Sequence, residues 1–156
     1  MITAQLLRCP DLAPRFVATL FVDPIPFLLH LPDVAYNFVY RSPHSANEWL
    51  VWYFSSRDPD VSRTLSRHFF WAENVLWKED LRDKVVAVAL SGQDQLVNAE
   101  MVRKYLTNED EEKEYWRKGR LEVLYYPELD HAMIFNVKRR WRRLIPVLDR
   151  FVRELN

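Results

Sequence analysis

Continuous apolar runs separated by turn residues mark three strands along the chain. The clearest is the run at 85–90, which Ser91 and Gly92 end. An apolar run without polar alternation is typical of a parallel strand that is covered on both faces. Shorter runs at 16–22 and 121–125 have the same character. We therefore predict an α/β fold with about three parallel strands and flanking helices.

Apolar residues at three- and four-residue spacing predict helices around these strands. Residues 2–12 form one helical segment, residues 98–106 form a second, and residues 139–155 form the last. The last helix has one apolar face, on which we expect Trp141, Leu144, Ile145, Leu148, Phe151, Val152 and Leu155. The charge run at 109–114 predicts an exposed loop, which Gly119 ends.

The segment between the first two strands lacks strand character. Residues 26–77 are proline-punctuated, rich in aromatic residues and helical in pattern. Asn47 and Asp58 are candidate helix N-caps, and Pro59 would occupy the first helical position after Asp58. We therefore expect several short helices here.

Candidate chemistry follows two neighbouring strands. Asp94 comes just after the strand at 85–90, and His131 lies in the loop after the strand at 121–125. In open α/β sheets, functional residues lie beyond the carboxyl ends of the strands. An acid after one strand and a histidine after the next therefore form a candidate catalytic pair.

This order resembles the carboxyl-terminal half of the α/β-hydrolase family, in which the triad runs serine, acid, histidine along the chain. The sequences LSGQDQLV and LDHAM are similar to the acid and histidine loops of that family, and the Asp23-Pro24 pair is similar to the end of the preceding strand. Asp130 departs from the pattern, because the family usually has glycine before the histidine. The resemblance implies that Asp94 holds the imidazole of His131, which takes a proton from a serine.

The nucleophile elbow of that family is absent from this sequence. The elbow needs the pattern G-x-S-x-G, whereas Gly92 and Gly119 are the two glycines of the chain and neither fits it. We therefore expect a partial hydrolase domain at 1–156, truncated or mis-started, with the serine and the oxyanion hole supplied by upstream sequence. The chain alone should not turn over an ester above background. The alternative is a degenerate, non-catalytic binding module.

The resemblance also implies a helical cap at 24–80, ahead of the core part at 81–156 that bears the acid and the histidine. Cap aromatics of the family commonly line a pocket for a small apolar ester, amide or epoxide. The implied substrate-binding residues are Phe27, Tyr36, Trp49, Trp52, Phe70 and Trp71. Ordinary packing between helices would also explain these aromatics.

The outer edge of the strand at 16–22 predicts a partner. In the family this strand pairs with the nucleophile strand, and without that neighbour its backbone groups are unpaired. Such an edge favours pairing with a second copy or another chain. We therefore expect the chain to be marginally stable alone or to need a partner.

Composition narrows the remaining classes. The 22 basic and 22 acidic residues balance, which argues against a general nucleic-acid role. The basic cluster at 138–143 could bind nucleic acid or anionic lipid, but we interpret it as the exposed face of a helix. No run predicts a membrane span or a signal peptide. The single cysteine, Cys9, fits a reducing compartment, which leaves the cytoplasm as the default location.

Neither a metal nor a cofactor is indicated by the sequence. His30, His44 and His68 show no zinc-ligand spacing among themselves. Cys9 could act as a nucleophile with His131 as its base, but a small buried helix residue is the simpler interpretation.

Overall fold

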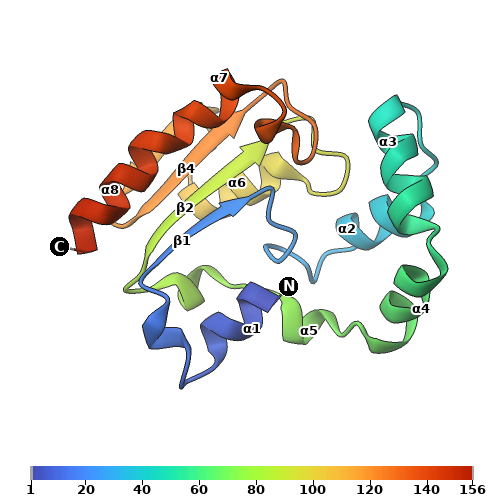
Figure 1. The fold of residues 1–156 in the computed structure, drawn as a ribbon, viewed down its shortest axis with the longest axis horizontal. Coiled ribbons are helices and arrows are strands. Elements are labelled where there is room, and N and C mark those ends of the chain that lie inside the picture. Colours follow the sequence, from blue (N-terminus) through green and yellow to red (C-terminus); the bar gives the residue numbers. More distant parts are fainter. Residues whose placement is uncertain (1, 156) are drawn as a thin grey trace.

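A four-stranded, mostly parallel sheet forms the centre of the computed structural model, which describes residues 2–155 (Figure 1). Strands β1 (Ala18–Val22), β2 (Val85–Ser91) and β4 (Leu121–Tyr126) are parallel neighbours. Strand β3 (Tyr115–Lys118) pairs with β4 in the antiparallel direction, and the order is β1-β2-β4-β3. The mixed α/β class and the three predicted strands are confirmed.

Strand β3 corrects the prediction of about three strands. Its sequence, Tyr-Trp-Arg-Lys, follows the charge run and is too short and too polar at its end to form an apolar run. Pairing with β4 therefore defines this strand. Gly119 turns the chain between β3 and β4 with a positive φ of 61°, and the Tyr115 hydroxyl donates to Glu122 Oε2 at 3.0 Å.

Helices cover both faces of the sheet. All seven residues of β2 are buried, as predicted for a central parallel strand. Val86, Val88 and Leu90 pack on the side of helix α6 (Ala99–Thr107), whereas Val85, Ala87 and Ala89 pack on the side of helix α8 (Ile145–Leu155). Figure 1 shows α8 along one face of the sheet and α6 behind the other. Strand β2 is therefore packed between helices on both of its faces.

The last helix is divided, and its buried face is narrower than predicted. Helix α7 (Lys138–Trp141) and the 3-10 turn η6 (Arg142–Leu144) precede α8. Leu144, Val147 and Phe151 are buried against the sheet. The other predicted face residues of α8 lie between 42% and 61% exposed, namely Ile145, Leu148, Val152 and Leu155. The apolar stripe of this helix is wider than the strip that contacts the sheet.

Residues 33–81, which include most of the predicted cap at 24–80, form a string of short helices beside the sheet (Figure 1). They are α2 (Asp33–Ala35), η2 (Tyr36–Tyr40), α3 (Ala46–Val51), η3 (Trp52–Ser56), α4 (Pro59–His68), α5 (Trp71–Asn74) and η4 (Lys78–Leu81).

Caps fix the starts of two of these helices. Asp58 caps α4 as predicted, accepting from the backbone N–H groups of Asp60 and Val61. The cap of α3 is Ser45 rather than Asn47, because Ser45 and Glu48 form a reciprocal capping box.

The N-terminal helix α1 (Ile2–Arg8) is shorter than the predicted segment and continues into the 3-10 turn η1 (Ala13–Arg15). Arg8 of α1 donates to Ala72 O and to Asp80 Oδ2, which ties this end of the chain to α5 and η4. Across residues 2–155, none of the helices combines the length and the apolar character that crossing a bilayer requires.

Candidate functional site

The loops after β2 and β4 bring Asp94 and His131 into direct contact. His131 Nδ1 lies 2.7 Å from Asp94 Oδ2. The Asp94 side chain is 1% exposed and that of His131 is 20% exposed. The two residues that the sequence analysis paired are therefore joined by a short, largely buried hydrogen bond.

Asp94 is held in place by its own loop. Its Oδ1 accepts the backbone N–H groups of Leu96 at 2.7 Å and Val97 at 2.9 Å. This local arrangement is the usual reason for an aspartate in a tight turn. It leaves Oδ2 directed at His131.

The histidine loop is anchored at its backbone. The backbone N–H of His131 donates to Gln95 Oε1 at 3.2 Å. Gln95 directly follows Asp94, so the acid loop binds both the backbone and the ring of His131. The next residue, Ala132, has a positive φ of 62°, which is unusual for alanine. With Nδ1 bonded to Asp94, Nε2 is the ring nitrogen left for a reacting group.

Asp23 is a third group of this site, and the sequence analysis did not assign it a role. It directly follows β1, is 4% exposed and has a positive φ of 44°. Its Oδ1 accepts Ser91 N at 2.7 Å, and its Oδ2 accepts Ser91 Oγ at 2.9 Å and Ala132 N at 2.8 Å. The sequence feature that could have identified Asp23 is its position, because it is the first polar residue after a predicted strand.

The charges at this site act on one another. Burial lowers the pKa of His131, but the hydrogen bond and charge of Asp94, together with the charge of Asp23, outweigh it, so the pKa is raised. Burial raises the pKa of Asp23 and the charge of Asp94 raises it further, although the N–H of Ala132 and the groups of Ser91 oppose this. The second carboxylate whose charge raises the pKa of His131 is thus Asp23.

Asp23, Asp94 and His131 are also the described residues that could hold a cation, since one ligand atom of each lies within 4.8 Å of the others. Their oxygens already accept N–H and O–H donors, and Nδ1 already contacts Asp94. A cation would have to displace these hydrogen bonds.

An apolar cavity of about 580 Å³ lies within the helical segment and touches the acid loop at Leu96. Its lining includes Leu29, Phe38, Leu65 and Phe69, and it reaches Leu96, two residues after Asp94. None of its lining residues is Asp, Glu, Lys or Arg. The cavity therefore suits an uncharged, apolar group of small-molecule size.

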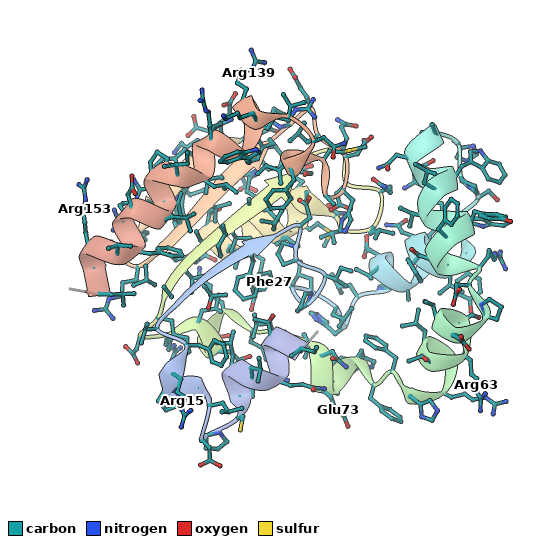
Figure 2. The ribbon with its side chains drawn as sticks, viewed as in Figure 1. Arg15, Phe27, Arg63, Glu73, Arg139 and Arg153 are labelled. Carbon is teal, nitrogen blue, oxygen red and sulfur yellow. The ribbon has the colours of Figure 1, made fainter. Side chains whose placement is uncertain are left out.

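The six aromatics assigned to a substrate pocket lie in different places. Trp71 lines the apolar cavity, and Trp52 lines a separate cavity of about 20 Å³ beside Gln95. Phe27 is 1% exposed and packs edge-to-face on Phe21 of the core, where Figure 2 shows it in the interior beside β1. The remaining three, Tyr36, Trp49 and Phe70, are more than half exposed.

The alternatives raised by the sequence lie away from this pair. Cys9 follows α1, and His30 packs against Trp71 and Trp77. In the basic cluster, Arg139 is exposed and points away from the molecule (Figure 2), whereas Arg143 pairs with Glu114 at 3.1 Å.

Comparisons with known proteins found no match: no family model, no curated protein and no solved structure is similar to this chain. The geometry of the site therefore carries the functional argument.

Proposed function

We propose that this chain supplies the acid–base half of a serine-hydrolase centre that resembles those of the α/β-hydrolases. The observation that carries the proposal is the 2.7 Å contact between His131 Nδ1 and Asp94 Oδ2, made by loops at the carboxyl ends of adjacent parallel strands. This is the order and the contact that an acid–histidine pair needs.

The chemistry follows from which ring nitrogen is engaged. Asp94 accepts the Nδ1 proton, so neutral His131 presents a lone pair at Nε2. Nε2 takes the proton of an attacking hydroxyl, and the imidazolium that forms is stabilised by Asp94. The same proton then passes to the leaving group. The raised pKa of His131 supports its role as a base.

The apolar cavity supports an uncharged, apolar substrate. Its wall includes Leu96 of the acid loop, two residues after Asp94, although neither Asp94 nor His131 lines it. Its volume is within the range of about 300–1,000 Å³ for small-molecule sites. We propose a small apolar ester, with an amide or an epoxide as chemically related alternatives, and residues 24–80 as a cap over it.

The nucleophile of this proposal lies outside the described residues. Ser91, the serine that contacts this site, is 1% exposed, and its hydroxyl donates to Asp23. We propose that a serine hydroxyl and its oxyanion-hole donors come from sequence upstream of residue 1 or from a second polypeptide.

The test is ester hydrolysis by the native protein isolated from its source. We expect His131→Ala to reduce kcat/KM for a short apolar ester by about 10⁴-fold or more, and His68→Ala, which removes an exposed histidine of α4, to leave it unchanged. Residues 1–156 alone should give no turnover above background. Native activity that survives His131→Ala would refute the proposal.

A second candidate function is a non-catalytic binding module, which the position of β1 favours. This strand is at the edge of the sheet, and among residues 2–155 only β2 pairs with it. An exposed edge can accept an extended segment of another chain by adding a strand. A stable dimer of the native protein, without hydrolytic activity, would support this function over the first.

A further inference from the structure

Asp23 connects three segments that are far apart in sequence. Its own position is the end of β1, Ser91 is the end of β2, and Ala132 belongs to the loop that carries His131. The carboxylate takes one hydrogen bond on Oδ1 and two on Oδ2. A side chain with three converging donors fixes the relative positions of the segments that supply them.

Because Asp23 is buried, losing any of its three hydrogen bonds would cost free energy of folding. Asp23 is 4% exposed and Ser91 is 1% exposed. A buried carboxylate is tolerated when donors satisfy it. The backbone on both sides is in the left-handed region, at Asp23 and at Ala132, which non-glycine residues avoid unless surrounding contacts hold them there. The Asp23–Ala132 hydrogen bond joins these two unusual positions directly.

We propose that Asp23 is a positioning residue for His131: through Ala132 N it sets the place of the histidine loop, so that the imidazole meets Asp94, and its charge is a second counter-charge for the imidazolium. The proposal rests on the role of the Asp94–His131 pair described above. Asp94 contacts the ring itself, whereas Asp23 acts through the backbone beside it and through its field.

Few charged groups near Asp23 could replace it as a counter-charge for the His131 imidazolium. The groups whose charge acts on its pKa or on that of His131 are Asp94 and these two residues themselves. The pKa of Tyr126, at the end of β4, is raised mainly by burial; the charge of Arg143 opposes this, and the charge of Asp23 adds to it. Removing the carboxylate should therefore be registered at His131 and Tyr126.

The experiment follows His131 by NMR in the isotope-labelled chain. Asp23→Asn keeps the size of the side chain but removes its charge and one acceptor oxygen. We expect the pKa of His131 to fall because one of the charges that raise it is removed, the Nδ1 proton signal to weaken, and amide exchange at Ala132 to rise about tenfold.

Asp130→Asn is the matched control. It removes the same charge one residue from His131, from a side chain that is not among the charges raising the pKa of His131, so His131 should titrate nearly as in the unchanged protein. A folded Asp23→Asn protein with normal His131 titration and tautomer would overturn the proposal, because a merely structural Asp23 would lower stability without altering His131.

The unchanged protein provides a second test if Asp23→Asn does not fold. The Ala132 amide proton should resonate downfield and should move as the Asp23 carboxyl titrates. An Ala132 amide that ignores this titration would also overturn the proposal. Neither readout depends on turnover, so a native protein without esterase activity would refute the proposed function and leave the role of Asp23 standing.

Discussion

The two oxygens of Asp94 have separate tasks, which makes Asp94→Asn informative. Oδ1 caps its own loop, and Oδ2 contacts His131. An asparagine can keep the loop contacts with its oxygen but presents an N–H₂ group to Nδ1, which favours the wrong tautomer. We expect native esterase activity to fall by about 10⁴-fold with little loss of stability, measured by kinetics and by urea unfolding. A stable protein with unchanged kcat would contradict this.

The charge of His131 predicts how stability depends on pH. Its pKa is raised in the folded protein above the ordinary value of about 6.5. The folded state therefore binds the proton more tightly, and the resulting stabilisation is fully present below that ordinary value and is lost as the pH rises through the folded pKa.

Unfolding in urea tests this at a pH of about 5.5 and again at about 8.5. The unchanged protein should exceed His131→Gln in stability by more at the acidic pH. In an Asp94→Asn background this difference should shrink, because the main partner of the imidazolium is gone. An equal stability difference at the two pH values would show that Asp94 and Asp23 do not stabilise the protonated form of His131.

Residue positions also show what the sequence could reveal. Asp94 and His131 were predictable because each follows an apolar strand, and strand ends converge in a parallel sheet. Asp23 follows its strand in the same way, but in the sequence it was interpreted only as part of the Asp23-Pro24 pair at the strand end. The contact with Ala132, 109 residues later, is visible only in three dimensions.

Close packing of loops explains Gly92 at the scale of elements. A Cβ at this position would lie 2.7 Å from Pro127 Cα, 2.8 Å from Pro127 O and 2.9 Å from the hydroxyl of Tyr125. Two of these atoms are backbone, so the acid loop and the histidine loop would have to move apart. We expect Gly92→Ala to destabilise by about 1–3 kcal/mol and to weaken the Nδ1 proton signal of His131.

Gly119→Ala is the comparison for this prediction. Gly119 has a φ of 61° with open space around its Cβ position, so alanine should cost about 1–2 kcal/mol of backbone strain without disturbing His131. If Gly92→Ala left the His131 signal intact, the two loops would not be coupled through this contact.

Elements differ in how far local pattern determines them. Strand β2 is buried along its whole length, and its apolar run predicted it directly. Strand β3 is partly exposed and forms by pairing with the free edge of β4. The sequence of a short segment does not show which strand edge will be available to it. The same limit affects α8, where the helix pattern was clear but the buried stripe depends on which residues meet the sheet.

At the scale of the whole molecule, the exposed edge of β1 predicts association. Val17 O accepts from Val85 N, and Asp23 N donates to Ala89 O. Because alternate residues of a strand direct their N–H groups to opposite sides, Ala18, Leu20 and Val22 direct theirs away from β2. We expect residues 1–156 to self-associate with rising concentration in sedimentation experiments.

A proline at Ala18 tests whether this edge is responsible. Ala18→Pro removes an outward N–H and leaves the ladder to β2 intact, so it should reduce association. Thr19→Pro removes an inward N–H and should instead destabilise the fold. A monomer with a sharp unfolding transition in the unchanged protein would show that the edge needs no partner.

The central claim is that His131, held by Asp94, is the base for a serine nucleophile. The most direct measurement is fluorophosphonate labelling of the native protein from its source, with the labelled residue identified by mass spectrometry. We expect one labelled serine, on the polypeptide that contains this chain or on one bound to it, and loss of that label in His131→Ala but not in His68→Ala. A native protein with no labelled serine, or with a label that persists without His131, would contradict it.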